Sequence, residues 1–310
     1  MDHNISYSIV IPVYNSTQSL QELAGRIDMV FRTEIKDSYE IIFVDDASSN
    51  KETWKILELL SKQHENIRSI QLMRNFGKQG AMMCGFMEVK GKYVITMDDD
   101  LQHFPEDIPV LISLKDHDIV IGKFSVKKHS FTKKIYSSLN SWFEEKLIGK
   151  PKHITNTPFK LIKSEVIEVI KNIRTSHPYV PALLFFATHD VVMAEVNHGA
   201  RAYDSSGFTF EKMYRTFSNM LFNNSSFLLQ LIAVMGVSIS LLSFIFGGYF
   251  LVKKLAVGIA VPGWASLMVV LLFIGGLILF SLGVVGEYLI RIINGIENKP
   301  AYLVRKKIGG

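Results

Sequence analysis

The sequence predicts an α/β fold, in which a mostly parallel sheet is covered by helices and is followed by a hairpin of two transmembrane helices. Up to residue 100, short apolar runs alternate with amphipathic stretches. The order strand, helix, strand favours parallel pairing with right-handed crossovers. Further along, residues 227–252 and 264–286 contain no charge. Each stretch is long enough for a membrane span, which needs roughly 20 apolar residues.

Four strands and the helices between them can be placed along the first part of the chain. The strands are expected at 8–12, 39–44, 67–72 and 93–97. A helix between the first two is indicated by apolar residues at helical spacing, namely Leu20, Leu23, Ile27, Val30 and Phe31. Two more helices are expected over 51–64 and 80–89, and a further strand over 118–122. This winding is typical of nucleotide-binding folds.

The apolar segments divide the rest of the chain. A domain of residues 1–205 precedes an amphipathic helix over 206–226, which we expect in the membrane interface, with a helix of the domain core as the alternative. Transmembrane helices are expected over 227–252 and 264–290, with an unusually apolar helical hairpin as the alternative. A basic tail, 291–310, follows.

The distribution of charge predicts the orientation. The link between the spans carries only two lysines, whereas basic residues gather on the outer flanks, at Lys212, Arg215, Arg291, Lys299, Arg305, Lys306 and Lys307. We therefore expect a multi-pass protein of the cytoplasmic (inner) membrane, with the large domain and both termini in the cytoplasm. No signal-peptide pattern opens the chain. The net charge of +5 fits attraction to membrane lipid better than binding of nucleic acid, for which no motif occurs.

Polar residues follow each of the first four strands. Ligands in such sheets bind beyond the carboxyl ends of the strands, where these residues should meet. They are Pro12, Tyr14 and Asn15, then Asp45 and Asp46, then residues 74–78 with Arg74 and Lys78, and finally Asp98 to Gln102. A carboxylate at Asp45 or Asp46 could accept the imide N–H of uracil or thymine, or could simply favour a helix N-terminus. Arg74 and Lys78 could bind a diphosphate, or could be surface charges.

The consecutive carboxylates Asp98, Asp99 and Asp100 repel one another unless a cation neutralises them, so they imply either a bound metal or raised pKa values. A divalent metal is the favoured interpretation, because Mg²⁺ takes oxygen ligands and completes its shell with water and substrate phosphates. A solvated acidic turn is the alternative. No glycine-rich phosphate-binding motif occurs, so a metal would have to hold a nucleotide diphosphate.

Five segments, in this order, resemble those of family 2 glycosyltransferases of the polyprenyl-phosphate class, similar to dolichol-phosphate mannose synthase and bactoprenol glucosyltransferase. The segments are SIVIPVYN, VDDASSN, RNFGKQGA, GKYVITMDDDLQHFPE and GVVGEYLIRIINGIENKPAYLVRKK. The resemblance implies a GT-A nucleotide-sugar-binding domain, with Pro12, Tyr14, Val44 and Asp46 around the base and ribose. It also implies a Mg²⁺ or Mn²⁺ site at Asp98, Asp100 and Gln102, with Asp99 in the variable middle position. Arg201 matches the arginine that meets the acceptor phosphate, with a surface cation beside lipid as the alternative.

The chain departs from the family pattern at three places. Ala47 stands where relatives usually have glycine, in a tight turn. Phe124 stands where a basic phosphate-binding residue is usual, and Lys123 could substitute for it. The segment 155–161 differs in the region that shapes the sugar pocket, so the identity of the sugar stays open.

The resemblance implies an inverting glycosyltransferase that moves a sugar from a nucleotide sugar, with UDP favoured, to undecaprenyl or a related polyprenyl phosphate, for cell-surface glycan or lipid modification. The acceptor is already an anion, so no general base is needed, and Asp98, Asp100 and Arg201 carry the catalytic roles by neutralising charge. A processive polysaccharide synthase is a weaker alternative, because no Gln-x-x-Arg-Trp motif occurs. A non-catalytic membrane-anchored scaffold or flippase-assisting subunit is another. Glycines in both spans permit the spans to pack with each other or with neighbouring copies in a homo-oligomer.

Overall fold

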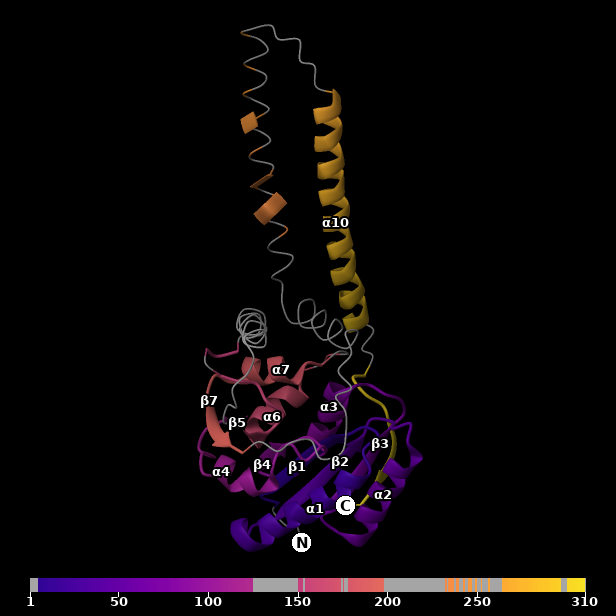
Figure 1. Cartoon of the computed structure of the whole chain (residues 1–310), viewed down its shortest axis with the longest axis vertical. Helices are drawn as coiled ribbons and strands as arrows, with labels where there is room; N and C mark the ends of the chain where they lie inside the picture. Colours follow the sequence, from indigo (N-terminus) through magenta and orange to yellow (C-terminus); the bar gives the residue numbers. More distant parts are fainter. Residues whose placement is uncertain are drawn as a thin grey trace. The chain divides into compact units, whose positions relative to one another are not determined.

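The computed structural model describes residues 5–124, 150–197 apart from 153, 174, 176 and 177, scattered residues between 232 and 256, and residues 264–296 and 300–309. The chain divides into two compact units, of which Met1–Lys212 and Asn298–Gly310 form the first and Met213–Glu297 the second. The first contains the sheet and the helices that cover it, and the second contains the helix α10, Trp264–Ile296 (Figure 1).

The first unit is built around an eight-stranded sheet in the order β7-β5-β6-β4-β1-β2-β3-β8. The strands are β1 (Tyr7–Val13), β2 (Tyr39–Asp45), β3 (Ile67–Leu72), β4 (Tyr93–Thr96), β5 (Ile119–Phe124), β6 (Lys160–Lys163), β7 (Val191–Val196) and β8 (Val304–Ile308). The strands expected at 8–12, 39–44, 67–72, 93–97 and 118–122 are thus confirmed. The sheet is mixed rather than mostly parallel, because β6 lies antiparallel to β4 and β5, and β8 lies antiparallel to β3.

Helices cover both faces of this sheet. They are α1 (Gln18–Val30), α2 (Lys51–Gln63), α3 (Lys78–Glu88), α4 (Ile108–Ile112), α6 (Ser164–Lys171) and α7 (Val180–Ala187), with short helical turns η1 (Phe31–Ile35) and η2 (Pro105–Asp107). One core cluster joins Ile9, Ile11 and Val13 of β1 to Leu20 and Leu23 of α1. Because side chains of a strand alternate between faces, Val10 lies on the opposite face, where α3 packs. A Cβ at Gly85 of α3 would lie only 2.3 Å from Val10 Cγ1, so glycine is needed for this close approach.

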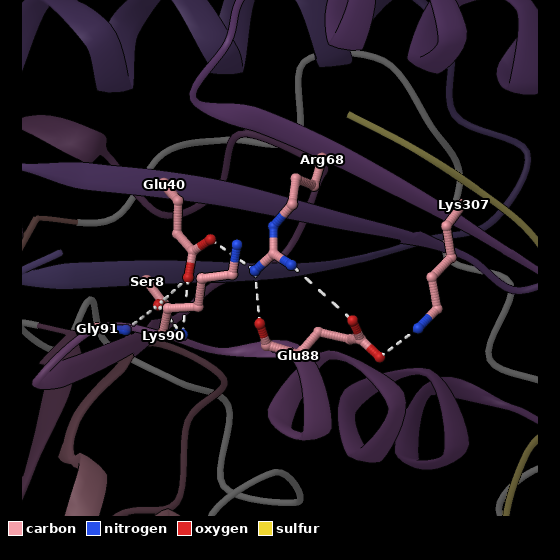
Figure 2. Close-up of polar contacts among 7 residues, drawn as sticks. All are labelled: Ser8, Glu40, Arg68, Glu88, Lys90, Gly91 and Lys307. Carbon is pink, nitrogen blue, oxygen red and sulfur yellow. Dashed lines mark hydrogen bonds and ion pairs between the residues drawn. The ribbon is translucent and has the colours of Figure 1, made fainter. Parts of the chain in front are cut away.

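A buried polar cluster joins the amino-terminal ends of β1, β2 and β3 to the end of α3 (Figure 2). Glu40 is 3% exposed, and its carboxylate accepts hydrogen bonds from Ser8 Oγ at 2.6 Å, from Lys90 N at 2.9 Å and from Arg68 Nη2 at 2.6 Å. The same Arg68 nitrogen donates to the carbonyl of Glu88, and Lys307 of β8 forms a 2.6 Å ion pair with the Glu88 carboxylate. This network fixes the edge of the sheet that lies opposite the carboxyl ends of β1, β2 and β3.

The predicted membrane hairpin is not shown by this structure. Counted over the residues that the structure describes, no helix is both long and apolar enough to cross a membrane, for which roughly 20 apolar residues are needed. This finding overturns the predicted localisation as a multi-pass protein of the cytoplasmic membrane with both termini in the cytoplasm. The predicted amphipathic helix 206–226 and most of the first predicted span, 227–252, lie outside the described residues.

The predicted basic tail, 291–310, contains an element that the sequence analysis did not anticipate. Its residues Val304–Ile308 form β8, the edge strand beside β3. Lysine is a common residue on such edges, because its charge discourages pairing with another chain. A run of basic residues is therefore compatible with a strand when one neighbour supplies the backbone partners.

Candidate functional site

The carboxyl ends of four neighbouring parallel strands share one edge of the sheet. In the order β4-β1-β2-β3, each adjacent pair is parallel, so the segments that follow these strands lie along the same edge. This is the arrangement that the sequence predicted for its polar clusters. Hydrogen bonds and one ion pair show which of the predicted residues actually meet.

Asn15 connects the segment after β1 to the segment after β2. Its backbone has a left-handed φ of 62°, a conformation that asparagine tolerates better than most residues. Its backbone N donates to Ser48 Oγ at 2.8 Å, and its side-chain Oδ1 accepts from Asn50 N at 3.0 Å and Ser49 Oγ at 3.1 Å. The predicted residue Asn15 therefore shapes the loop before α2.

Asp45 has a similar bracing role one strand further along. Its side chain is fully buried and accepts from Ser48 N at 3.0 Å and from Gln71 Nε2 of β3 at 3.1 Å. These bonds hold the ends of β2 and β3 together. Asp45 thus supports the edge from within the sheet.

Asp46 binds the backbone of the loop that follows β3, residues 73–77, which we call the 73–77 loop. Its Oδ1 accepts from Phe76 N at 2.7 Å and its Oδ2 accepts from Gly77 N at 2.8 Å. Within the same loop, the guanidinium carbon of Arg74 lies 4.7 Å from the centre of the Phe76 ring. The position of the 73–77 loop thus depends on a carboxylate that the sequence analysis assigned to nucleotide binding.

The other residues predicted around the base lie on β1 and β2. Pro12 and Val44 face each other in the register of these strands, and both are buried. Tyr14, just beyond β1, is 48% exposed. Of these three side chains, Tyr14 is the one that a ligand could reach without rearrangement.

An ion pair joins the start of α3, directly after the 73–77 loop, to the acidic turn after β4. Lys78 Nζ, at the start of α3, lies 2.5 Å from Asp98 Oδ1. Burial by itself raises the pKa of Asp98, but the neighbouring basic groups, first among them the Lys78 ammonium, together lower that pKa below its usual range. In the sheet, β1 and β2 lie between β3 and β4. The ion pair therefore links the segments that follow two non-adjacent strands, β3 and β4.

The two carboxylates next to Asp98 differ from it in environment. Burial raises the pKa of Asp99 to about 7; a hydrogen bond with Ser16 opposes this rise, while the charges of Asp98 and Asp100 add to it. Oδ2 of Asp99 has no hydrogen-bond partner among the described residues. Asp100 Oδ1 accepts from Gln102 N at 3.1 Å across Leu101, whose φ is 58°. Of the two outcomes that the sequence predicted for crowded carboxylates, a raised pKa is thus found at Asp99.

The donor atoms of this turn fit a divalent cation. Asp98, Asp100 and Gln102 offer hard oxygen ligands within five consecutive residues, and Asp99 leaves a buried oxygen without a partner in the described part of the chain. Among the described residues, no group of three His, Cys, Asp or Glu side chains forms a metal site by itself. A cation would thus need water or substrate phosphate to complete its shell, as Mg²⁺ usually does.

His103 is a residue near the site that sequence reasoning missed. It is 3% exposed, and its ring centre lies 5.1 Å from that of Phe124 and 5.4 Å from that of Phe159. Neither ring nitrogen has a partner among the described residues, and burial lowers the pKa of His103 to about 4, so the ring is neutral. In the sequence, the position of His103 directly after Gln102 was the signal that could have identified it. The packing also gives Phe124 a role where the family pattern has a basic residue.

Two other predicted residues are not brought into this cluster. Lys123 precedes Phe124 in β5, so its side chain leaves the strand on the face opposite the one against which His103 packs. Within the described residues, no ion pair joins Lys123 to the acidic turn. Arg201, the predicted partner of the acceptor phosphate, lies outside the described residues.

Ala47 holds a backbone conformation that favours glycine. Its φ is 52°, and a residue with a Cβ pays about 1–2 kcal/mol in that region. We expect Ala47→Gly to stabilise the protein by roughly 0.5–1 kcal/mol, since relief of strain exceeds the extra entropy of glycine in the unfolded chain. Chemical denaturation monitored by circular dichroism would measure this gain. Ala24→Gly within α1 is the control and should lower stability by about 1 kcal/mol, whereas a loss of stability in both variants would contradict the assignment.

Comparison with known proteins places the chain in a family. Residues 8–169, more than half of the chain, match the model of glycosyl transferase family 2. The chain belongs to this family. An uncharacterized glycosyltransferase of Synechocystis sp. is 32% identical to it, over 97% of this chain and 95% of the relative. The undecaprenyl-phosphate 4-deoxy-4-formamido-L-arabinose transferase of Klebsiella pneumoniae is 29% identical, over 97% of this chain and 93% of the relative.

Solved structures share the fold of the greater part of this family 2 glycosyltransferase. Glucosyl-3-phosphoglycerate synthase from Mycobacterium tuberculosis, in complex with Mn²⁺, UDP-glucose and phosphoglyceric acid, gives a TM-score of 0.52 at 12% identity, over 70% of this chain and 79% of that one. The same enzyme with Mg²⁺ and UDP gives 0.52 at 15% identity, over 72% of this chain and 80% of that one. This likeness confirms the predicted GT-A-like α/β fold, although the sheet is mixed where a mostly parallel one was predicted.

Proposed function

We propose that this family 2 glycosyltransferase transfers a sugar from a nucleotide sugar, with UDP as the favoured nucleotide, to undecaprenyl or a related polyprenyl phosphate, with inversion at the anomeric carbon. The observation that carries the proposal is the 2.5 Å ion pair between Lys78 and Asp98, which joins the start of α3, directly after the 73–77 loop, to the acidic turn. It gathers cations and carboxylates at the sheet edge where such folds bind ligands. The names of the full-length relatives support the class of acceptor.

Each residue of the edge would have a part in holding the donor. Tyr14 and Asp46 would contact the base and ribose, with Pro12, Asn15, Val44 and Asp45 supporting them. Asp98, Asp100 and Gln102 would hold Mg²⁺ or Mn²⁺, which when bound supplies positive charge beside the departing diphosphate. Solved structures of the same fold contain these ions together with UDP. Lys78 already contacts Asp98 and would exchange this contact for a diphosphate oxygen, with Arg74 as a further cation; Lys123, which leaves β5 on the other face, is not assigned to the diphosphate.

The acceptor simplifies the chemistry that the protein must perform. A polyprenyl phosphate is ionised at neutral pH, so its oxygen can attack the anomeric carbon while the bond to the diphosphate breaks, and no proton has to be removed. A single displacement of this kind inverts the anomeric centre. The protein's contribution is then positioning and neutralisation of charge, with Arg201 proposed to bind the acceptor phosphate.

The test is transfer of labelled sugar by the full-length protein. We expect product from one member of a panel of UDP-sugars with undecaprenyl phosphate and Mn²⁺ or Mg²⁺, and loss of product on chelation of the metal. Asp100→Ala should lower the rate at least about a hundredfold, and so should Asp100→Asn, because the asparagine keeps an oxygen for Gln102 N but lacks the charge.

Lys55→Ala serves as the control for handling of the protein. Lys55 is an exposed residue of α2 whose ion pair with Glu52 lies on the surface, so its loss should leave transfer unchanged. Equal product from the native protein and both Asp100 variants would refute the catalytic proposal and favour the scaffold alternative. Absence of product from the native protein with every donor and metal would do the same.

A further inference from the structure

The segment 301–309, which contains β8 and which we call the β8 segment, holds the first residue of the 73–77 loop at both backbone groups. Met73 N donates to Leu303 O at 2.8 Å, and Arg305 Nη2 donates to Met73 O at 3.0 Å. The 73–77 loop, whose Phe76 and Gly77 donate hydrogen bonds to Asp46, is therefore also held by hydrogen bonds at its first residue. These two sets of contacts come from parts of the chain that are more than 200 residues apart.

The pairing of β8 with β3 is irregular at Arg305, the residue that contacts the loop. Leu72 faces Val304 and Gln71 faces Lys306, so the register shifts and Arg305 has no Cα partner in β3. An extra residue of this kind is a β-bulge, which bends the strand and re-aims a side chain. The guanidinium of Arg305 consequently reaches a backbone carbonyl beyond the end of β3.

The β8 segment also contacts both ends of α3, the helix that begins directly after the 73–77 loop. At the start of α3, a Cβ on Gly80 would lie 3.0 Å from Ala301 O and 2.8 Å from Phe76 Cβ, so the segment, the loop and the helix are closely packed there. At its end, Lys307 Nζ lies 2.6 Å from Glu88 Oε1 (Figure 2). Lys78, which reaches Asp98, is the first residue of this helix.

We propose that the β8 segment is a positioning element for the donor-binding loop, and that Arg305 is its positioning residue. Arg305 acts through Met73 and does not touch the ligand. By fixing the start of the loop, it limits the conformations of Phe76, Gly77 and Lys78, and so lowers the entropy that donor binding must remove. This inference rests on the proposed function, because it assigns the 73–77 loop to the donor.

Two measurements on the full-length protein test the inference. In the first, hydrogen exchange of a peptide covering residues 73–79 is compared between the native protein and Arg305→Ala; we expect faster exchange in the variant. In the second, calorimetric titration with UDP and Mn²⁺ should show affinity weakened about fivefold, less than the full loss of a hydrogen bond from a charged donor would give, because Arg305 acts on the ligand only through Met73. In the transfer assay, the KM for the donor should rise while kcat stays nearly constant.

Lys306→Ala is the matched control. Lys306 is the next residue of β8, but it contacts Glu58 at 3.6 Å and lies over the Trp54 ring, both of which belong to α2. It should change neither exchange of the loop nor UDP affinity, and Arg305→Lys should restore part of both. Native exchange of the loop in Arg305→Ala would overturn the inference whether or not UDP binds, and so would equal effects of Arg305→Ala and Lys306→Ala. If the native protein fails to bind UDP, the proposal that UDP is the donor nucleotide is refuted. The hydrogen-exchange result still decides whether Arg305 holds the loop.

Discussion

Replacing Glu40 by alanine should lower the free energy of unfolding by about 3–5 kcal/mol, because it leaves the Arg68 guanidinium buried without its charged partner. The side chains of Glu40 and Arg68 are only 5% and 12% exposed, and the nearest atoms of the two groups are 2.6 Å apart. The remaining carboxylate near Arg68 is that of Glu88, at 3.9 Å (Figure 2). Water therefore has little access to the Arg68 guanidinium, and its solvation does not compensate for the lost ion pair. Guanidinium-induced unfolding monitored by circular dichroism would measure the loss.

Two comparisons show whether burial causes this effect. Lys55 and Glu52 form an ion pair of the same 2.6 Å length with 68% and 61% exposed side chains, so Lys55→Ala should cost less than about 1 kcal/mol. The double variant Glu40→Leu with Arg68→Met removes both charges and should recover most of the stability lost in Glu40→Ala. Similar losses for Glu40→Ala and Lys55→Ala would show that the buried network does not stabilise the sheet.

Much of the fold was predictable because its apolar pattern is regular. The strands β1 to β4 are short buried runs, and α1 and α2 repeat apolar residues at helical spacing. Both the apolar runs and the helical spacing can be read from the sequence. β8 was missed because three charged residues, Arg305 to Lys307, follow one another at an exposed sheet edge and give no alternation of apolar and polar positions. The mixed character of the sheet was missed because neither of the antiparallel strands, β6 and β8, was expected.

The location of the candidate site followed from topology, but its contacts did not. Parallel strands bring their carboxyl ends to one edge, so the gathering of Asp46, Lys78 and Asp98 could be anticipated. Sequence does not reveal that Asp46 binds backbone amides, because these donors look the same at every residue. His103 was missed because a single histidine beside an acidic motif is uninformative until its packing against two aromatic rings is known.

Asp46→Ala should abolish detectable UDP binding and should also lower the free energy of unfolding by about 2–4 kcal/mol, because two backbone amides lose a charged acceptor. Phe76 N and Gly77 N donate to the two oxygens of Asp46 at 2.7 and 2.8 Å. Gly77 N has a second, longer contact to Asn75 Oδ1 at 3.2 Å, so it keeps one acceptor in the variant. Calorimetric titration with UDP and Mn²⁺, together with denaturation, measures both effects.

Asn75→Ala separates the strong contact from the weak one in the same loop. By itself it should cost less than about 1 kcal/mol, since Gly77 N keeps the shorter bond to Asp46. Combined with Asp46→Ala, it leaves Gly77 N without either acceptor, so the double variant should lose more stability than the sum of the single changes. If Asp46 served only to bind the base, UDP affinity would fall while stability stayed native. That result would contradict a role in holding the loop, because a carboxylate that only meets the ligand contributes nothing to the protein without it.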